Sequence, residues 1–412
     1  MLNEIKSGSS YRNRWLAKNM REGLKVSPVI VLTGARQTGK STLLQNELPF
    51  RNWRYITFDD LDVLAQAKRD PEALLSLEVD TVIDEVQRAP EVLAAIKRSV
   101  DRGRRIRFLL SGSANLLLMK QVSETLAGRA LYFVLQPFAR REWRRAGIPV
   151  WFFSLFEDKW PKESRCGAYN PKASLFKGFL PPVLRVKKQL QSSFWWEGYV
   201  RTYLERDLRE LSQVASLSDF KKVMEMLALQ TGGILNETDV ARSLSMSQPT
   251  VHRYINLLET SHLFVKLRPY TKGKSKRIIK APKAYFLDSG LASYLAGYHT
   301  VDSAPPEFTG HLFETMVMGH LSTLASLMRA NLYYWRTFGG REREVDFVIE
   351  KEHKLIALEV KLSNKVNYGD IQNIMHFMND NRACVAGLVV YTGTDLKYLT
   401  KSIIAVPWTA LC

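Results

Sequence analysis

Three features of this 412-residue sequence predict an α/β protein made of three consecutive parts. A glycine-rich loop follows an apolar run near the N-terminus and precedes a helical pattern. Two short helical patterns joined by a tight turn lie in the middle of the chain, and strand patterns that carry acidic residues lie near its C-terminus. Each pattern has its own hydrophobic period and turn chemistry. We therefore expect three domains, at residues 1–190, 191–300 and 301–412.

The glycine-rich loop is the most specific of these features. Residues 34–41, GARQTGKS, fit the pattern G-x-x-x-x-G-K-[ST], with a predicted buried strand at 28–32 before them and a predicted helix from 42 onward. In that setting the backbone curls so that several N–H groups point at one phosphate group, and the helix N-terminus adds partial positive charge. The expected ATP-binding residues are Gly34, Ala35, Arg36, Gln37, Thr38, Gly39, Lys40, Ser41 and Thr42.

Four side chains near this loop have the chemistry of ATP hydrolysis. Lys40 is expected to reach the β- and γ-phosphates, and Ser41 is expected to bind Mg²⁺. A β-branched strand pattern ends in Asp84 and Glu85. We expect Asp84 to hold the Mg²⁺ shell and Glu85 to polarise the attacking water. The sequence thus predicts a Mg²⁺-dependent ATPase.

Three further residues in the same region have two interpretations each. Ser113 and Asn115 follow a strand pattern, where one of them could contact the γ-phosphate or cap the helix that follows. Arg129 follows the next helical pattern. It could reach the γ-phosphate of a neighbouring subunit, as a catalytic residue, or form a salt bridge at a helix end.

Together these segments resemble an AAA-type ATP-binding protein. More specifically, the chain is similar to the prokaryotic family in which a P-loop ATPase domain precedes a C-terminal domain of unknown function. The resemblance covers nearly the whole chain and is carried by residues 34–41, 81–85, 111–115, 126–129, 199–207 and 282–291. It implies an AAA-type ATPase domain with ATP and Mg²⁺ as its cofactors.

One segment, residues 147–182, departs from the family pattern. Lysine and arginine alternate there with aromatic residues, which are Trp151, Phe152, Phe153, Phe156, Trp160, Tyr169, Phe176 and Phe179. Aromatic side chains among basic ones can stack on nucleic-acid bases. They can also pack an inserted loop onto its own domain. Both interpretations stay open at this point.

The middle of the chain predicts a helix-turn-helix. Asn236 is a good N-cap for a first short helix, residues 245–247 form a tight turn, and Pro249 lies in the first turn of a second helix. Strand patterns at 263–267 and 284–287 would complete a winged helix. The side chains expected to face a DNA groove are Ser247, Gln248, Thr250 and Arg253.

The segment between these two strands is strongly basic, which suits contact with DNA phosphates. The residues expected to make such contacts are Lys272, Lys274, Lys276 and Arg277. The net charge of +18 also favours a nucleic-acid partner, although basic chains also bind anionic membrane surfaces or are basic for solubility. Winged helices in ATPases of this kind serve as lids or oligomer contacts as well, so this alternative stays open.

The C-terminal region carries three spaced acidic residues and a lysine. Asp346 begins one strand pattern, and Glu359 and Lys361 share a face of the next, because side chains alternate along a strand. This spacing resembles the core of the PD-(D/E)xK nucleases and implies a restriction-endonuclease-like α/β domain. In such a site Asp346 and Glu359 would hold Mg²⁺, Glu314 would add a carboxylate, and Lys361 would position the water or the phosphate. A plain ion pair between Glu359 and Lys361 is the alternative, and many members of such folds lack activity.

Composition and hydrophobicity indicate where in the cell the protein is expected. The three cysteines are scattered and indicate neither a disulfide framework nor a zinc site. Because disulfide-rich proteins belong to oxidising compartments, we expect this protein in the reducing cytoplasm. No run of eighteen apolar residues and no apolar signal core is present, so no membrane span is expected. The expected function is an ATPase that couples ATP to DNA engagement as a homo-oligomer, with possible metal-dependent DNA cleavage. The alternatives are an ATP-driven switch that controls oligomerisation or a protein partner, with an inactive nuclease-like fold, and a DNA-binding regulator whose hydrolysis is vestigial.

Overall fold

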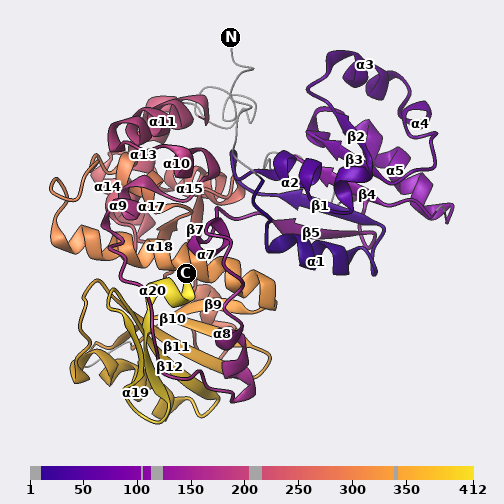
Figure 1. The fold of residues 1–412 in the computed structure, drawn as a ribbon. Coiled ribbons are helices and arrows are strands. Elements are labelled where there is room, and N and C mark those ends of the chain that lie inside the picture. The colour runs from indigo at the N-terminus through magenta and orange to yellow at the C-terminus, as the bar shows by residue number, and fades with distance from the viewer. Residues whose placement is uncertain (1–10, 104, 113–123, 204–215, 338–341) are drawn as a thin grey trace. The chain divides into compact units, whose positions relative to one another are not determined.

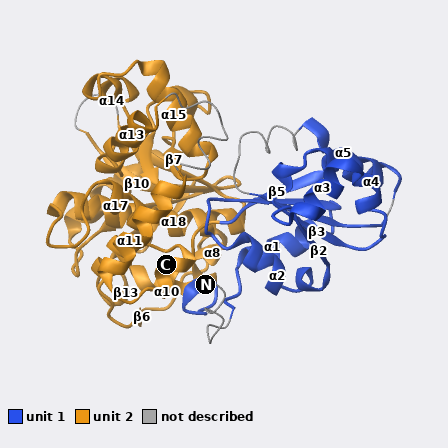
Figure 2. Cartoon of the chain, turned by 90° about the horizontal axis from the view of Figure 1, so that it is seen from above, with its two compact units in different colours: residues 1–135, 142–148 blue, residues 136–141, 149–412 orange. Residues whose placement is uncertain are grey.

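The computed structural model describes most of the chain, namely residues 11–103, 105–112, 124–203, 216–337 and 342–412 (Figure 1). The chain divides into two compact units (Figure 2). The first comprises Met1–Leu135 and Glu142–Ile148, and the second comprises Gln136–Arg141 and Pro149–Cys412. Among the described residues, no helix has the length and apolar character needed to cross a membrane.

A five-stranded sheet with the order β2-β3-β4-β1-β5 forms the centre of the first unit. All of its neighbouring strands are parallel. The strands are β1 (Val29–Thr33), β2 (Arg54–Thr57), β3 (Thr81–Asp84), β4 (Phe108–Ser111) and β5 (Ala130–Val134). Every residue of β1, β3 and β4 is buried, as expected for a parallel sheet that is covered on both faces.

Helices cover the two faces of this sheet. They are α1 (Leu16–Gly23), α2 (Lys40–Asn46), α3 (Leu61–Arg69), α4 (Pro71–Leu74) and α5 (Glu91–Asp101), with 3₁₀ turns at Phe50–Asn52 and Val86–Arg88. Alternate residues of β1 join different cores: Val29 and Val31 pack with α3, α4 and α5, whereas Ile30 and Leu32 pack with α1 and α2. This alternation follows from the two-residue period of a strand. Because all neighbouring strands of this sheet are parallel, their carboxyl ends meet at one edge, where ligands bind in such folds.

Helices form the first part of the second unit. They are α8 (Val150–Ser154), α9 (Lys172–Lys177), α10 (Pro181–Arg185), α11 (Gln189–Thr202), α13 (Leu217–Leu229), α14 (Glu237–Ser243), α15 (Gln248–Thr260), α16 (Lys276–Ile279) and α17 (Ser289–Leu295). The short helix α7 (Arg140–Trp143) crosses the boundary between the units, with Arg140 and Arg141 in the second. An antiparallel strand pair, β7 (Phe264–Leu267) and β8 (Lys283–Phe286), brackets α16.

The rest of the second unit is built on a seven-stranded sheet with the order β6-β13-β14-β12-β11-β10-β9. Strands β9, β10 and β11 are antiparallel, β11, β12 and β14 are parallel, and β13 and β6 are added antiparallel. The strands are β6 (Ser164–Arg165), β9 (Asn331–Arg336), β10 (Glu344–Lys351), β11 (Lys354–Lys361), β12 (Cys384–Tyr391), β13 (Asp395–Tyr398) and β14 (Ile403–Pro407). The accompanying helices are α18 (Pro306–Met328), α19 (Gln372–Asp380) and α20 (Trp408–Leu411), with 3₁₀ turns at Leu155–Glu157 and Tyr368–Ile371.

Residues 149–190 fold with the second unit, although the sequence analysis assigned them to the first domain. The reason is a long-range strand pairing: β6 lies antiparallel to β13, with Ser164 opposite Leu396 and Arg165 opposite Asp395. The regions expected as second and third domains also lie in this one unit. The division into three domains stays a prediction.

Candidate functional site

The predicted strand, glycine loop and helix occur in that order as β1, residues 34–39 and α2. Gly34 has φ of +139° and Gly39 has φ of +94°. A Cβ atom on Gly34 would lie 2.5 Å from the carbonyl oxygen of Leu135. Only glycine fits the backbone at that position, because an L side chain would be strained by the torsion and would also clash. The loop therefore keeps its curled path next to the sheet edge.

Lys40, Ser41 and Thr42 form the first turn of α2. The Lys40 ammonium is nearly buried and donates to the carbonyl oxygens of Gly34 at 2.9 Å and Ala35 at 3.1 Å. Thr38 also donates its hydroxyl to the carbonyl of Ala35, at 2.9 Å. The ammonium thus lies against the backbone of its own loop. To bind a phosphate it must exchange these carbonyl contacts for phosphate oxygens.

Asp84 ends β3 with its side chain buried, and a residue of the neighbouring strand binds it. The Tyr55 hydroxyl donates to Asp84 Oδ2 at 2.6 Å. Burial and then this hydrogen bond raise the pKa of Tyr55, and the nearby side chains of Gln45 and Ser41 oppose the shift. Tyr55 therefore binds Asp84 and lies near Ser41, and these are the two residues expected to hold Mg²⁺. Hydroxyl and carboxylate oxygens are the ligands that this ion prefers, so these residues fit it.

Glu85 adopts a strained backbone conformation directly after Asp84. Its φ of +55° lies in the left-handed region, which costs a non-glycine residue about 1–2 kcal/mol. Its carboxylate accepts a hydrogen bond from the side-chain amide of Gln87, and its backbone N–H donates to Asp84 Oδ1 at 3.1 Å. Strain of this kind gathers at functional positions. Gln87 thus fixes the Glu85 carboxylate, directly after the buried Asp84.

The remaining expected residues of the first unit have different outcomes. Ser113 and Asn115 lie outside the described residues. Arg129 donates from Nε to Asp101 Oδ1 at 2.6 Å and from Nη1 to the carbonyl of Ala127 at 3.0 Å. The salt bridge at a helix end is therefore present, and contact with the γ-phosphate of a neighbouring subunit stays a prediction.

Helices α14 and α15 lie where two helices joined by a turn were expected. Asn236 caps α14 by accepting from the N–H groups of Thr238 and Asp239, and Ser247 caps α15 by accepting from the N–H of Thr250. The residues expected to face DNA are all at the surface: Ser247, Gln248 and Arg253 are exposed and Thr250 is half-buried. These positions are available to a partner.

The basic segment between β7 and β8 has one exception to the expected exposure. Lys272, Lys274 and Lys276 are exposed. Arg277 is only 6% exposed, because α16 directs it inward to Glu350, with Nη1 2.7 Å from Oε2. Its guanidinium also lies 4.4 Å from the ring centroid of Tyr270. This corrects the expectation for Arg277, whose charge is already paired and is not available to DNA phosphates.

The expected nuclease-like residues gather around a lysine that the sequence analysis did not assign to the site. Lys283 in β8 is 2% exposed, and its Nζ lies 2.9 Å from Glu314 Oε1 and 3.9 Å from Asp346 Oδ1. It also pairs with Glu344, and Tyr285 donates its hydroxyl to Glu314. Lys283 and Tyr285 share a face of β8 because they are two residues apart, which is the only signal of this arrangement in the sequence.

Burial sets the protonation of this cluster. Burial, followed by the charge of Asp346, raises the pKa of Glu314 to about 7, although Lys283 opposes the shift. Burial and Asp346 also raise the pKa of Glu359. Burial opposes the charge of Lys283, but the carboxylates of Glu314, Asp346 and Glu344 outweigh it and raise the pKa of this lysine. The cluster therefore consists of several acidic side chains around the buried ammonium group of Lys283.

This network does not fit the metal site expected from Glu314, Asp346 and Glu359. Asp346 Oδ2 accepts from the backbone N–H of Val360 at 2.7 Å, and Lys361 Nζ lies 3.5 Å from Glu359 Oε2. In the part of the chain that the structure describes, no group of three or more His, Cys, Asp or Glu side chains is arranged to hold a metal ion. The Lys283 ammonium is instead paired with Glu314 and lies 3.9 Å from Asp346 Oδ1, and these are two of the three expected metal ligands.

Comparisons with known proteins match this chain to three family models, to relatives and to a solved structure. A family model described as an AAA domain matches residues 26–143, and models described as domains of unknown function match residues 171–302 (DUF8612) and 309–411 (DUF4143). The uncharacterized protein Rv2008c of Mycobacterium tuberculosis is 30% identical over 395 residues, which cover 95% of this chain and 82% of that protein. The uncharacterized protein MJ1637 of Methanocaldococcus jannaschii is 24% identical, over 92% of this chain and 83% of that protein. Among solved structures, the Walker-type ATPase PABY2304 of Pyrococcus abyssi has a TM-score of 0.44 and 16% identity, over 68% of this chain and 94% of that one.

Proposed function

This chain belongs to the family that joins an AAA-type P-loop ATPase domain to a C-terminal domain of unknown function, and from that premise we propose a Mg²⁺-dependent ATPase that couples ATP binding and hydrolysis to DNA engagement. One observation carries the ATPase part of the proposal. The phosphate loop, Ser41 and the Asp84–Glu85 pair lie together at the carboxyl edge of one parallel sheet, where the Tyr55 hydroxyl binds Asp84 and lies near Ser41.

Each residue of this edge has a proposed part in the reaction. Lys40 and the loop N–H groups bind the β- and γ-phosphates, and Ser41 and Asp84 hold the Mg²⁺, which neutralises charge on the phosphates. Glu85 accepts a proton from the attacking water. Ser113 or Asn115 contacts the γ-phosphate. Arg129, paired with Asp101, is proposed to stabilise a helix end.

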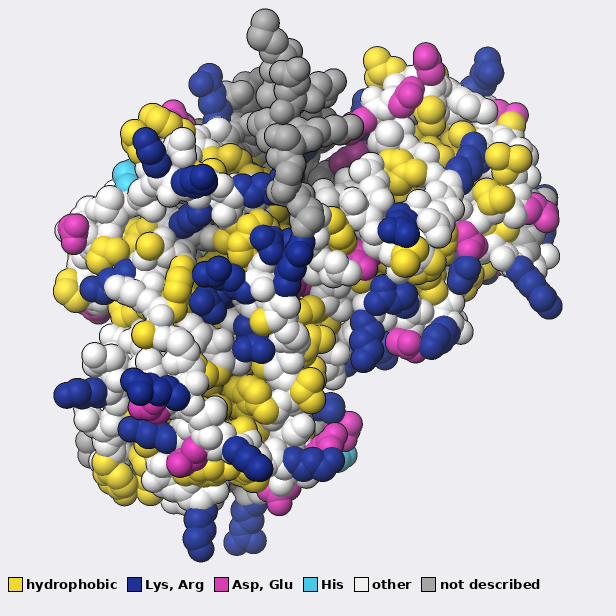
Figure 3. All heavy atoms as spheres, in the orientation of Figure 1, with side chains coloured by type: hydrophobic (Ala, Val, Ile, Leu, Met, Phe, Trp, Pro, Cys, Tyr) yellow, Lys and Arg dark blue, Asp and Glu magenta, His cyan; other side chains and the backbone are white. Residues whose placement is uncertain are grey.

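The DNA part of the proposal rests on charge and exposure in the second unit. We infer a winged helix formed by α14, α15, β7 and β8, with α15 directed at a groove and the exposed lysines of the basic segment directed at phosphates. Lysine and arginine side chains are scattered over the visible face of the molecule, in keeping with the net charge of +18 (Figure 3). Neutralising several phosphates in this way gives affinity that falls steeply with salt.

A second candidate function is favoured by Lys283. The alternative is an ATP-driven switch that controls oligomerisation or a protein partner and carries an inactive nuclease-like fold. A buried ammonium among Glu314, Glu344 and Asp346 supports the inactive fold, because it holds the acids without a metal ion. The same lysine is compatible with the DNA-coupled ATPase, so inactivity of the fold does not by itself separate the two candidates.

One experiment separates the candidates. Purified full-length protein is incubated with ATP and Mg²⁺, with and without single-stranded, duplex and branched DNA, and phosphate release, strand integrity and the oligomeric state of the protein are measured. Lys40→Ala protein, which is expected to lose nucleotide binding, is the control. Hydrolysis stimulated by DNA with intact strands supports the DNA-coupled ATPase. ATP-dependent assembly that is indifferent to DNA supports the switch and overturns the DNA proposal.

A nuclease would give a different pattern in the same experiment. Mg²⁺-dependent cleavage that disappears in both Asp346→Ala and Lys361→Ala would show that the C-terminal site is active, against the argument from Lys283. Cleavage that persists in both variants would come from another site or from a contaminant. Turnover equal to that of Lys40→Ala protein under every condition would overturn the ATPase proposal itself.

A further inference from the structure

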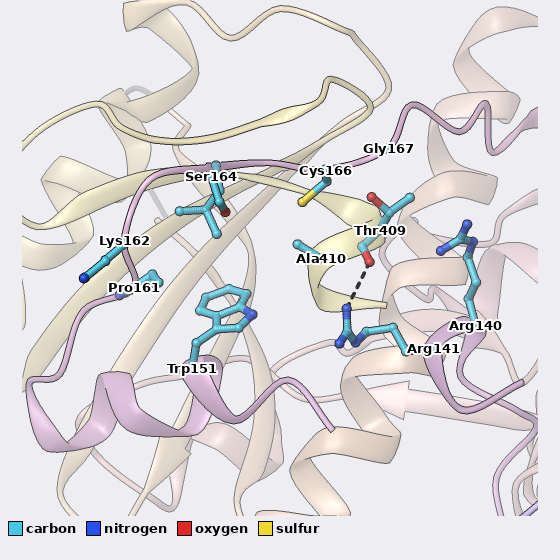
Figure 4. A pocket seen from close by; sticks show the side chains of 11 residues that line it. Arg140, Arg141, Trp151, Pro161, Lys162, Ser164, Cys166, Gly167, Thr409 and Ala410 are labelled. Carbon is cyan, nitrogen blue, oxygen red and sulfur yellow. Dashed lines mark hydrogen bonds between the residues drawn. The ribbon is translucent and has the colours of Figure 1, made fainter. Parts of the chain in front are cut away.

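A cavity of about 540 Å³ in the second unit is not used by the proposed function. Figure 4 shows it between the segment 161–167, the helix α8 and the C-terminal helix α20. Part of its lining comes from the aromatic and basic segment, residues 147–182, whose purpose the sequence left open. A volume of this size is within the range of small-molecule sites, which is roughly 300–1,000 Å³.

The wall formed by residues 161–167 is fixed to the sheet at several points. Strand β6 pairs with β13, and the Cys166 N–H donates to the carbonyl of Thr394 at 2.7 Å. The Tyr398 hydroxyl donates to the carbonyl of Pro161 at 2.9 Å. Further on, Trp408 Nε1 donates to the carbonyl of Tyr169 at 3.2 Å. Because both ends of this wall are held, the cavity is formed before any ligand arrives.

The charged residues that line the cavity are all basic. They are Arg140, Arg141 and Lys162, and none of the lining residues in the described chain is an aspartate or glutamate. Arg141 is half-buried, and its Nη1 lies 3.5 Å from the carbonyl oxygen of Thr409, which is a weak contact. Burial lowers the pKa of Arg141, which is the effect of withdrawing a cation from water. An anion bound in the cavity would offset this cost of burying the Arg141 guanidinium.

Further features describe the rest of the ligand. The Thr409 hydroxyl oxygen is buried and has no hydrogen-bond partner within the described residues. Opposite the arginines, the Trp151 indole points from α8 into the cavity between Pro161 and Ala410 (Figure 4). The cavity therefore offers bidentate donors for a phosphate at one side and a flat aromatic surface at the other.

We propose that this cavity binds a nucleotide unit, with its 5′-phosphate on Arg141 and Arg140 and its base against Trp151. Inorganic phosphate alone would leave the aromatic wall unused, whereas a nucleotide engages both sides and fits the volume. Base stacking on an aromatic side chain contributes binding free energy with every kind of base. The unit comes either from a free nucleotide or from the 5′-phosphorylated end of a DNA strand, and both share this chemistry.

The test uses full-length Lys40→Ala protein, in which the phosphate loop is silenced. Adenosine 5′-monophosphate, inorganic phosphate, and a thymidine trinucleotide with and without a 5′-phosphate are titrated by isothermal calorimetry. Saturable binding of the monophosphate or of the 5′-phosphorylated trinucleotide is expected, and the tighter of the two identifies the source. We expect inorganic phosphate and the unphosphorylated trinucleotide to bind at least about tenfold more weakly, because each lacks one of the two contacts.

Variants tie the binding to this cavity. Arg141→Ala is expected to weaken it about tenfold or more, with Arg141→Lys intermediate, since lysine keeps the charge but loses the fork of donors. Arg144→Ala, an exposed arginine on the same stretch of chain, is the matched control and is expected to bind normally. If Arg141→Ala does not fold, Trp151→Ala and Lys162→Ala test the aromatic wall and the exposed rim in its place, and a weakening of at least about twofold is expected for each.

Three results would overturn the proposal. One is the absence of saturable binding for every nucleotide probe. A second is inorganic phosphate that binds as tightly as the monophosphate. The third is binding that is unchanged in the folded cavity variants or equally weakened in Arg144→Ala. Since these measurements use protein without a working phosphate loop, their failure leaves the ATPase proposal untouched, and the reverse also holds.

Discussion

Lys283 Nζ and Glu314 Oε1 lie 2.9 Å apart, and both side chains are almost fully withdrawn from water. The lysine comes from β8 and the glutamate from α18, so the pair joins the antiparallel pair β7–β8 to the helix α18. Charges withdrawn from water are costly unless they are paired, and here each depends on the other. The pair therefore acts mainly as a structural clamp within the second unit.

The first prediction removes the positive member of this pair. Lys283→Met leaves the acids of the cluster buried without a counter-charge, and we expect the free energy of unfolding to fall by about 3–5 kcal/mol. Urea denaturation followed by circular dichroism measures the loss. Lys276→Met, at an exposed lysine of α16, is the control and is expected to change stability by less than about 0.5 kcal/mol.

The double variant Lys283→Met with Glu314→Gln sharpens that prediction. It removes both charges of the pair, so part of the lost stability is expected to return. A single variant that loses less than about 1 kcal/mol would show that the acids are already neutral in the folded protein, contrary to the pairing argued above.

The second prediction concerns pH and His320. The backbone N–H of Arg140 donates to His320 Nε2 at 3.1 Å, and Nδ1 lies 2.8 Å from the carbonyl of Met316, so the ring is neutral with its proton on Nδ1. Burial lowers the pKa of His320 to about 4. Between about pH 6.5 and pH 4 the unfolded chain binds a proton that the folded chain does not. Stability from this group is therefore present above pH 6.5 and is lost as pH falls toward 4.

The size of this effect follows from the same shift. Between pH 7 and pH 5 the second unit is expected to lose about 2 kcal/mol through His320. Urea denaturation of wild-type and His320→Gln protein at several pH values measures it, because glutamine does not titrate. Other groups affect both proteins alike, so the difference between the two curves isolates the histidine. A difference that does not vary with pH would contradict the neutral ring.

Contacts between residues close together in the sequence were predictable, whereas contacts between distant residues were not. The phosphate loop, the strand that ends in Asp84 and the paired helices α14 and α15 follow from short-range pattern and capping, and the family matches confirm the AAA-type domain and the C-terminal domain of unknown function. Tyr55 and Lys283 were missed as site residues because their partners lie 29 and 31 residues away. Such contacts depend on which strands become neighbours, and no local period contains that information.

Two other differences have the same origin. Arg277 was expected at the surface because its neighbours are basic, but a short helix turns it toward Glu350, 73 residues further along the chain. The segment 149–190 was assigned to the first domain from its position in the chain. Its strand β6 instead pairs with β13, and Leu396 lies opposite Ser164. Composition describes what a segment can contact, and the pairing of distant strands decides what it does contact.

The third prediction tests Tyr55 as a positioning residue. Its hydroxyl holds Asp84 Oδ2, so Tyr55→Phe leaves the carboxylate free to turn away from Ser41. Loss of such outer contacts weakens metal sites by about 10–100-fold, and we expect the Mg²⁺ concentration at half-maximal ATPase activity to rise at least about tenfold. Nucleotide binding without Mg²⁺ is expected to be unchanged, which a merely destabilised protein would not show.

Tyr132→Phe provides the matched control for this variant. Tyr132 lies in β5 of the same sheet and is 41% exposed. It lies opposite Val31 in the middle of β1, away from the carboxyl end of the sheet. An unchanged Mg²⁺ requirement in Tyr55→Phe protein would remove Tyr55 from the site. The same increase in both variants would indicate a general effect of altering the sheet.

The last prediction separates ATP binding from hydrolysis through Glu85. Its carboxylate is held by Gln87 and lies beside Asp84, so Glu85→Gln keeps the shape of the site and removes the proton acceptor. A positioned general base contributes about 10²–10⁴-fold, so turnover is expected to fall by that factor while ATP affinity stays within about threefold of the wild-type value. Phosphate release and equilibrium titration measure the two quantities separately.

Gln87→Ala is expected to lower turnover less, since it keeps the Glu85 carboxylate but removes the side chain that fixes its orientation. Near-normal turnover in Glu85→Gln protein would assign the water to another residue, and lost ATP binding would instead mean that the strained turn at Glu85 shapes the phosphate loop.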